Sequence, residues 1–240
     1  MRILVLGHQG MLGHMVYDYL GKQNHMETEN NCFRWPDNKF KEEIINFTGD
    51  VIVNCIGSIP QRKLEFDINF KLPIWLDRNA PCLVIHPGTD CEIDSDSYGV
   101  SKKKAFDYIT KEGQSTKIIK TSIIGPELKT QCSLLEWFLN TKEKKVNGFT
   151  QCYWNGITTL QWSKVCYDII TKSKEEYGQV VLPSSKCISK FELLNIIREV
   201  YNVDTIVEPD STKESNKCLV GNFEVPSIEK QLVELRRYNK

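Results

Sequence analysis

The sequence has no excess of charge of either sign and no long apolar run. Its 240 residues contain 31 Lys and Arg residues against 31 Asp and Glu residues. Without a basic surface field, neither nucleic acid nor an anionic membrane is expected as a partner. No apolar run approaches the ~20 residues that a membrane span requires, and the first residues enter a strand rather than a signal segment. We therefore expect a cytosolic (cytoplasmic) protein.

The nine cysteines include no C-x-x-C motif, and their number is odd. Neither a disulfide framework nor a zinc site is expected from this pattern, and we predict no metal-ligand set. Most of the thiols are expected to be small buried apolar side chains in a reducing compartment. The cysteines lie at positions 32, 55, 82, 91, 132, 152, 166, 187 and 218.

Apolar runs that alternate with amphipathic segments predict an α/β fold. With 40% hydrophobic residues, the chain suffices for one domain, or for one large domain with a small appendage. Strands that alternate with helices form a parallel, doubly wound sheet. We expect a helix after the first strand, strands at 1–6, 26–33, 51–56, 82–86 and 118–124, and helices at 41–47, 67–78, 98–111 and 133–140.

The regular alternation loosens after residue 145. Residues 1–145 are assigned to a Rossmann-type domain, and residues 146–240 to a small C-terminal α/β portion that caps the cleft at the carboxyl edge of the sheet, where open α/β sheets bind ligands. The two portions are expected to pack together rather than to fold independently. In the second portion we predict strands at 148–154, 179–182 and 206–209, helices at 158–172 and 189–201, a polar loop at 210–217 and a closing helix from 226.

Three glycines follow the first predicted strand at a spacing that suits a phosphate. The segment Gly7-His-Gln-Gly10-Met-Leu-Gly13 opens an apolar helix. In such a loop the first glycine permits a tight turn, the second lets the backbone approach a pyrophosphate, and the third lets helix and strand pack closely. The anion then lies at the helix N-terminus. This pattern favours a dinucleotide site over a simple turn. Residues 1–145 are therefore expected to be an NAD(P)-binding domain, and residues 146–240 a substrate-binding portion.

Tyr98 and Lys102 are four residues apart on a predicted helix, so both side chains project from one face. Because a neighbouring cation stabilises phenolate, Lys102 is expected to lower the pKa of Tyr98 and make it a better acid towards a carbonyl. By itself the pair also fits a half-buried tyrosine beside a solvated lysine. The context favours chemistry, because the strand that ends at His86 delivers Pro87-Gly-Thr89-Asp-Cys91 to the carboxyl edge just before this helix.

With these motifs together, the sequence resembles the extended short-chain dehydrogenase/reductase family, and within it the dTDP-4-dehydrorhamnose reductase group of sugar-nucleotide reductases. The resemblance implies that Tyr98 donates a proton, that Lys102 lowers its pKa and binds the nicotinamide ribose, and that Thr89 orients the keto group. Hydride would come from the nicotinamide. The likeness covers nearly the whole chain and is carried by residues 7–13, 53–57, 89–91, 98–102, 121–125, 134–138 and 154–159.

The resemblance also implies a set of cofactor-binding residues. An acid ~20 residues past the glycines hydrogen-bonds to the ribose 2′-hydroxyl of NAD, whereas an arginine accommodates the 2′-phosphate of NADP. Because Glu27 and Glu29 precede that position and Arg34 lies near it, NADP(H) is favoured and NAD(H) stays open. Besides Tyr98 and Lys102, the set comprises Gly7, Gln9, Gly10, Met11, Leu12, Gly13, Arg34, Cys55 and Gly57.

On the substrate side, the resemblance implies contacts from Thr89, Asp90, Lys129, Trp154 and Asn155. The alternatives stay open: Lys129 also fits a solvated charge, Trp154 a core residue, and Asn155 a turn residue.

Cys91 lies where similar epimerase/reductases have an acid/base cysteine. With a reference pKa of ~8.5, a thiol suits removal of a proton beside a 4-keto group. Simple packing of Cys91 fits the sequence equally well. Epimerisation also needs a partner acid on the opposite sugar face, and the loop at 127–132 has no histidine, which leaves Lys129 as the best candidate.

The expected function is reduction of the 4-keto group of a UDP- or dTDP-linked 4-keto-6-deoxyhexose, with or without 3- or 3,5-epimerisation. The product would be a rhamnose-like or N-acetylated deoxysugar donor. One alternative is a non-catalytic NADP-binding regulatory subunit of a partner enzyme. Another is a sugar-nucleotide dehydratase or epimerase, although Asp90 followed by Cys91 retains only half of the acid pair of similar dehydratases. A homodimer through the helix of Tyr98 is also implied by the resemblance.

Overall fold

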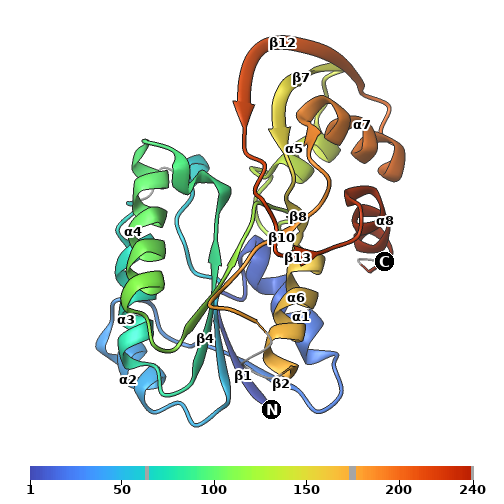
Figure 1. Cartoon of the computed structure of the whole chain (residues 1–240). Helices are drawn as coiled ribbons and strands as arrows, with labels where there is room; N and C mark the ends of the chain where they lie inside the picture. The colour runs from blue at the N-terminus through green and yellow to red at the C-terminus, as the bar shows by residue number, and fades with distance from the viewer. Residues whose placement is uncertain (63–64, 173–176, 239–240) are drawn as a thin grey trace. The chain divides into compact units, whose positions relative to one another are not determined.

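The computed structural model describes residues 1–62, 65–172 and 177–238 (Figure 1). They form two compact units. Unit 1 comprises Met1–Lys120 and Ser163–Val181, and unit 2 comprises Thr121–Trp162 and Leu182–Lys240. The chain thus passes from one unit to the other three times, whereas the sequence predicts a single boundary after residue 145. The assignment of cofactor to one part and substrate to the other stays a prediction.

Unit 1 contains a six-stranded parallel sheet in the order β2-β1-β3-β4-β5-β9, which is a Rossmann-type doubly wound arrangement. The predicted fold class is confirmed. The strands are β1 (Arg2–Leu6), β2 (Glu27–Asn30), β3 (Val51–Asn54), β4 (Leu83–Gly88), β5 (Thr116–Lys120) and β9 (Val180–Val181). The helices are α1 (Met11–Gly21), α2 (Asn38–Ile45), α3 (Ile68–Asn79), α4 (Ser97–Glu112) and most of α6 (Thr159–Thr171), with short 3-10 turns η1 (Pro60–Arg62) and η2 (Asp90–Ile93).

Helices cover both faces of this sheet, so its central strands are apolar on both sides. Figure 1 shows α2, α3 and α4 on one face. On the other face α1 and α6 are neighbours, because the rings of Tyr19 and Tyr167 meet edge to face with centroids 6.4 Å apart. The core under α2 and α3 consists of Leu4, Leu6, Phe40, Ile44, Ile52, Leu72, Leu76 and Val84.

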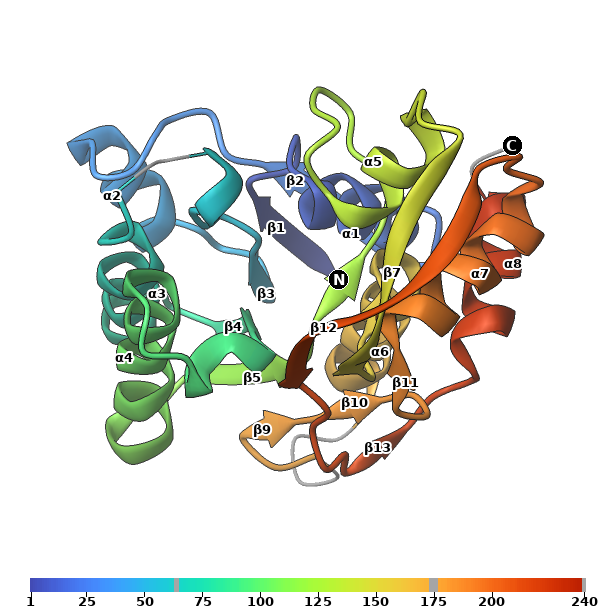
Figure 2. The same ribbon diagram turned by 90° about the horizontal axis from the view of Figure 1, so that it is seen from above.

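Unit 2 is built around a three-stranded sheet in the order β11-β7-β12. Figure 2 shows β7 and β12 running side by side. Ser189 caps α7 through a capping box with Glu192. The strands are β6 (Ile123–Ile124), β7 (Lys145–Trp154), β8 (Ile157–Thr158), β10 (Pro183–Ser184), β11 (Ile188–Ser189), β12 (Ile206–Asn216) and β13 (Phe223–Glu224), and the helices are α5 (Leu134–Asn140), α7 (Lys190–Tyr201) and α8 (Ile228–Tyr238).

Two predicted elements are wrong. The single strand expected at 118–124 is two strands, because β5 pairs with β4 in unit 1 whereas β6 pairs with β8 in unit 2. The loop expected at 210–217 is mostly strand, since β12 continues to Asn216 in parallel pairing with β7. Its polar composition misled the prediction because β12 lies at the edge of its sheet, where polar side chains face solvent.

The cysteine prediction is also wrong in part. Cys187 and Cys218 form a disulfide, although they lie 31 positions apart and no sequence motif marks the pair. Cys32 and Cys132 are exposed rather than buried. Cys152 and Cys166 are buried, as expected for small apolar side chains.

No helix among the residues that the structure describes is both long enough and apolar enough to span a membrane.

Candidate active site

The glycine loop between β1 and α1 favours glycine at two positions, Gly7 and Gly13. Gly7 adopts a φ of 76°, in the left-handed region. A Cβ atom at Gly13 would lie 2.1 Å from the carbonyl oxygen of Gly7, so any side chain there would push α1 away from the loop. Gly10 precedes α1 as its N-cap without a capping side chain, which leaves the first amides of the helix facing the loop. This cradle fits the pyrophosphate of a dinucleotide.

Asn31 follows β2 directly, at the position where an acid would hydrogen-bond to the ribose 2′-hydroxyl of NAD. The sequence reasoning did not identify this residue. Its Oδ1 accepts a 3.3 Å hydrogen bond from the amide of Gly7. Its Nδ2 donates a 2.6 Å hydrogen bond to the carbonyl of Phe33. Glu29 is engaged elsewhere, since its carboxylate lies 2.6 Å from the guanidinium of Arg2. Arg34 is exposed in the loop after β2.

Thr89 lies just after β4 and caps the short turn η2. Its Oγ1 accepts a 3.3 Å hydrogen bond from the amide of Cys91 and donates one of 3.2 Å to Asp90 Oδ1. The Cys91 thiol lies 3.4 Å from the same Asp90 oxygen. Glu92 completes a capping box, because its Oε1 accepts a 3.1 Å hydrogen bond from the amide of Thr89. The turn therefore presents one hydroxyl, one carboxylate and one thiol at the carboxyl edge of the sheet.

The helix α4 places Tyr98 beside this turn. Asp96 caps the helix by accepting a 2.6 Å hydrogen bond from the amide of Gly99. A Cβ atom at Gly99 would lie 2.4 Å from the carbonyl oxygen of Cys91, so this glycine lets the first turn of α4 press against η2. The Thr89 side chain lies close enough to Tyr98 to lower the pKa of the phenol. Two residues predicted to act on one carbonyl are thus brought together.

Lys102 lies one turn further along α4 and is buried. Its ammonium donates a 2.7 Å hydrogen bond to the carbonyl oxygen of Pro87 at the end of β4. His86, also buried, has a pKa well below its usual value, first because of desolvation and then because of the Lys102 charge. Asn54 Nδ2 lies 3.1 Å from His86 Nδ1 and donates to it when the imidazole is neutral. Asn54, which the sequence reasoning did not single out, therefore orients a neutral histidine beneath Lys102.

The acidities of the two residues differ from the sequence expectation. Desolvation raises the pKa of Tyr98 to about 12, and Cys91, Asp90 and Glu92 raise it further, whereas Thr89 opposes the rise. The prediction that Lys102 brings this pKa down is wrong here, because Lys102 is not among the groups that shift it, and the neighbouring Cys91, Asp90 and Glu92 act in the same direction as desolvation. Desolvation instead lowers the pKa of Lys102 itself to about 8, against an opposing contribution from Glu92.

A second residue that the sequence reasoning missed is Asn69 on α3. Its amide bonds to both the amide and the carbonyl of Ser58, at 2.8 and 3.0 Å, in the loop after β3. It also donates a 3.1 Å hydrogen bond to Ser101, whose hydroxyl in turn donates to the carbonyl of Tyr98. Asn69 therefore ties the loop after Cys55 and Gly57 to the helix of Tyr98.

The remaining predicted substrate residues lie in unit 2. Trp154 is 1% exposed and packs across the backbone of Gly156. The side-chain amide of Asn155 donates a 2.8 Å hydrogen bond to the carbonyl of Leu219 and accepts one of 2.9 Å from the backbone amide of the same residue. These contacts favour packing roles for both residues. Lys129 is exposed in the loop before α5.

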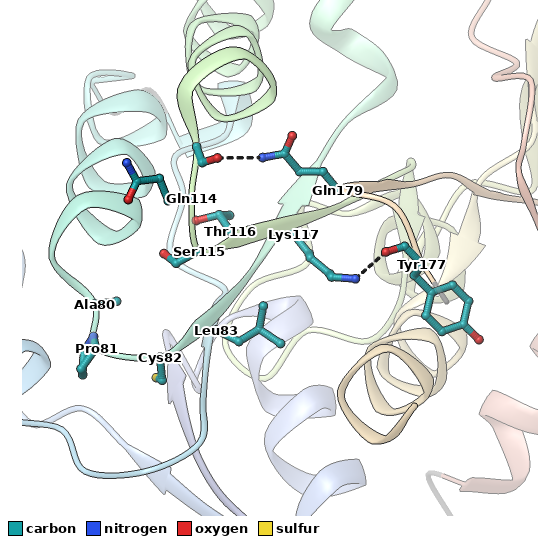
Figure 3. Close-up of a pocket in the computed structure, with 11 residues that line it drawn as sticks. Ala80, Pro81, Cys82, Leu83, Gln114, Ser115, Thr116, Lys117, Tyr177 and Gln179 are labelled. Carbon is teal, nitrogen blue, oxygen red and sulfur yellow. Dashed lines mark hydrogen bonds between the residues drawn. The ribbon is translucent and has the colours of Figure 1, made fainter. Parts of the chain in front are cut away.

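A pocket of about 530 Å³ lies at the other edge of the unit 1 sheet, where β4 and β5 begin (Figure 3). Lys117 donates a 2.5 Å hydrogen bond to the carbonyl of Tyr177 there, and Gln179 bonds to the carbonyl of Gly113 at 3.5 Å. Open parallel sheets bind their ligands at the carboxyl ends of the strands. The pocket is therefore separate from the candidate catalytic residues.

Across the described parts of the chain, no group of three or more His, Cys, Asp or Glu side chains could hold a metal ion.

No family model and no curated protein matches the sequence. Solved structures do match. A dTDP-4-dehydrorhamnose reductase from Bacillus anthracis in complex with NADP has a TM-score of 0.81 at 15% identity, over 100% of this chain and 99% of that one. An orthologue from Clostridium acetobutylicum has a TM-score of 0.78 at 15% identity, with the same coverage. This chain has their fold.

The same fold extends to other sugar-nucleotide enzymes. A UDP-glucose 4-epimerase from Thermotoga maritima, solved with UDP-glucose, has a TM-score of 0.74 at 14% identity, over 100% of this chain and 99% of that one. The similar fold therefore accommodates more than one reaction on nucleotide sugars.

Proposed function

We propose that this protein is an NAD(P)H-dependent reductase of the 4-keto group of a nucleotide-linked 4-keto-6-deoxyhexose. The observation that carries the proposal is the proximity of the Thr89 and Tyr98 side chains at the carboxyl edge of the sheet, close enough for Thr89 to lower the pKa of Tyr98, with Lys102 one helical turn away. The glycine cradle at Gly7–Gly13 supplies a fitting site for the pyrophosphate of the cofactor. A nicotinamide bound there would provide the hydride.

Each residue has a defined task in this proposal. Thr89 orients the keto oxygen, and Tyr98 donates its phenolic proton to the alkoxide that forms there. With a pKa of about 12, Tyr98 keeps its proton at neutral pH, and it can still give it up because an alkoxide is a much stronger base. Lys102 contributes an ammonium for the nicotinamide ribose, since only one of its three donors is committed to Pro87 in the described contacts.

We favour NADPH over NADH. The residue after β2 is Asn31, a neutral side chain already bonded to Gly7 and Phe33, so the ribose 2′-hydroxyl meets no acid there. Arg34, exposed three residues further on, offers a cation for a 2′-phosphate. Among the proteins of similar fold, one is solved with NADP and another, a dTDP-glucose 4,6-dehydratase from Bacillus anthracis, with NAD.

The nucleotide is proposed to be UDP or dTDP and the product a rhamnose-like or N-acetylated deoxysugar donor. The support is the sequence resemblance together with the fold shared with dTDP- and UDP-sugar enzymes. Product identification by NMR after incubation with NADPH and a panel of UDP- and dTDP-4-keto-6-deoxyhexoses tests this. A C4-reduced sugar from at least one member is expected, and no reduction of any member would remove the proposal.

Epimerisation is a second candidate, favoured by the position of Cys91. Its thiol lies 3.4 Å from Asp90 and close enough to Tyr98 to influence the pKa of that phenol. A base at this place suits proton exchange at C3 or C5 beside the keto group. In heavy water without NADPH, deuterium uptake at those carbons is expected from the wild type and not from Cys91→Ser. Equal uptake by both would exclude Cys91.

The alternative of a non-catalytic binding subunit predicts that the protein binds NADPH but oxidises it with no keto-sugar. A cytosolic location and a homodimer stay predictions from the sequence.

A further inference from the structure

Glu92 and Lys120 form an ion pair inside unit 1. The Glu92 Oε2 and Lys120 Nζ atoms are 2.7 Å apart, and their side chains are 3% and 13% exposed. The ion pair between Lys103 and Asp107 on α4 is very different, with side chains 54% and 39% exposed. Exposed pairs contribute little to structure or stability. A buried pair holds its geometry, because either charge without the other would be strongly destabilising.

Glu92 uses its other carboxylate oxygen to hold the backbone of Thr89. Its Oε1 accepts the 3.1 Å hydrogen bond from the Thr89 amide that closes the capping box of η2. One carboxylate therefore joins the turn that carries the proposed substrate-orienting hydroxyl to a cation on β5.

Lys120 extends that connection to the helix of the proposed proton donor. It stands at the end of β5, and its ammonium lies 4.0 Å from the centroid of the Phe106 ring on α4. Lys120 thus contacts η2, which Thr89 caps, and α4, which carries Tyr98 and Lys102. Both contacts are made by a single ammonium, on a side chain that is 13% exposed.

We propose that Glu92 and Lys120 are positioning residues that hold the Thr89 turn against α4, so that the Thr89 hydroxyl and the Tyr98 phenol converge on one carbonyl oxygen. The proposal rests on the proposed reductase function and deepens it. Neither residue belongs to the glycine loop, to the Thr89 motif or to Tyr-x-x-x-Lys, and 28 positions separate them in sequence. They meet only because β4 and β5 are neighbours in the sheet.

The Glu92 charge also acts on Lys102. Two titratable groups interact with the charge of Lys102, namely His86 on β4 and Glu92 on η2. Beyond them, Lys120 on β5 pairs with Glu92, and Asp90 and Cys91 on η2 act on Tyr98, which lies on the same helix as Lys102. Among them Glu92 raises the pKa of Lys102, in opposition to the larger effect of desolvation, while His86 is kept neutral by burial. Removing this carboxylate therefore leaves desolvation unopposed, and the pKa of Lys102 falls further.

Two substitutions separate charge from shape. Glu92→Gln keeps an oxygen for the Thr89 amide but loses the charge, and Lys120→Met keeps an apolar chain against Phe106 but loses the ammonium. The double variant leaves no unpaired charge in the interior. Replacement of the exposed pair, Lys103→Gln with Asp107→Asn, is the matched control.

We expect Lys120→Met to lower kcat about 10- to 100-fold, with KM for NADPH within about twofold, because misplacement of Thr89 affects the reaction more than cofactor binding. The double variant should recover part of that loss. In Glu92→Gln the alkaline limb of kcat/KM should move to lower pH. The control pair should behave as wild type.

If Lys120→Met does not fold, Lys120→Arg, which keeps the ion pair, takes its place. Its kcat is expected to stay near that of wild type, while Glu92→Gln still moves the alkaline limb of kcat/KM to lower pH.

Titration of Lys102 can be measured without any catalytic turnover, so it tests the positioning role independently of the proposed reductase function. The ¹³C chemical shift of the Lys102 ε-carbon, assigned with Lys102→Met, should titrate at lower pH in Glu92→Gln than in wild type. Absence of NADPH oxidation by wild type with every keto-sugar would defeat the reductase function alone. Pair variants that lose only melting temperature, with kcat, the pH profile and the Lys102 titration unchanged, would overturn the positioning role.

Discussion

The ammonium of Lys102 donates a 2.7 Å hydrogen bond to the carbonyl oxygen of Pro87, two residues before Thr89. This bond ties α4 to the end of β4 and fixes a buried cation beneath the candidate active site. Burial has a chemical consequence, because desolvation lowers the pKa of Lys102 to about 8 while it raises that of Tyr98 to about 12. In the usual assay range, therefore, Lys102 is the member of the pair that titrates.

The pH dependence of kcat/KM should reflect this. Lys102 carries its charge below about pH 8 and loses it above, so activity should fall as the pH rises through 8. Tyr98 stays protonated throughout that range. Stopped-flow measurement of NADPH oxidation between pH 6 and 10 checks the position of the limb.

Lys102→Arg assigns that limb, because arginine stays charged at every assay pH. Its residual activity should show no fall near pH 8. A limb that persists unchanged in this variant would contradict the assignment to Lys102.

The glycine loop predicts two distinct defects. Gly10→Ala places its Cβ 3.4 Å from the nearest atom, so the fold should survive while NADPH affinity falls about tenfold or more, because the methyl group takes space beside the pyrophosphate. Gly13→Ala brings its Cβ to 2.1 Å from Gly7 and should lower the melting temperature as well. Gly178→Ala, with no atom within 4 Å, is the control. Calorimetric titration with NADPH and thermal melts separate the three, and an unchanged affinity in Gly10→Ala would place the cofactor elsewhere.

Cofactor preference should depend on Arg34. Arg34→Ala is expected to weaken NADPH binding about tenfold and leave NADH binding unchanged, because only NADPH has a 2′-phosphate. Arg78→Ala, which removes an exposed arginine at the end of α3, should change neither affinity. Equal losses for both nucleotides in Arg34→Ala would mean that this arginine does not select between them.

Asp77 at the end of α3 offers a test of the fold that is independent of activity. Its buried carboxylate accepts hydrogen bonds from the amides of Gln114, Ser115 and Thr116 at 3.0 to 3.2 Å, where β5 begins. Asp77→Ala leaves these buried amides without their acceptor and should lower the free energy of unfolding by about 3 kcal/mol in urea titrations. Asp107→Ala, in an exposed ion pair, should cost less than about 1 kcal/mol. Similar losses in both variants would contradict this role.

Local sequence patterns predicted the parts of the candidate site that are short in sequence. The glycine triplet, Thr89, and the pair Tyr98 and Lys102 each depend on spacing within one turn or one helix, and spacing is visible in the chain. The parallel sheet followed from alternation of apolar strands with helices.

The features that could not be predicted depend on distant partners. Lys120 reaches Glu92 only through the pairing of β4 with β5, and Asn31 is recognisable only once its bond to Gly7 is seen. The disulfide between Cys187 and Cys218 joins two loops with no shared motif. The rise in the pKa of Tyr98 was missed for a related reason, because desolvation depends on the whole surrounding core rather than on Lys102 alone.

The most direct test of the central claim compares wild type with Tyr98→Phe in single-turnover assays that contain NADPH and a UDP- or dTDP-4-keto-6-deoxyhexose. The substitution removes only the phenolic oxygen, so NADPH affinity should stay within about twofold while the rate of NADPH oxidation falls about 1000-fold. An oxidation rate in Tyr98→Phe equal to that of wild type would contradict the account.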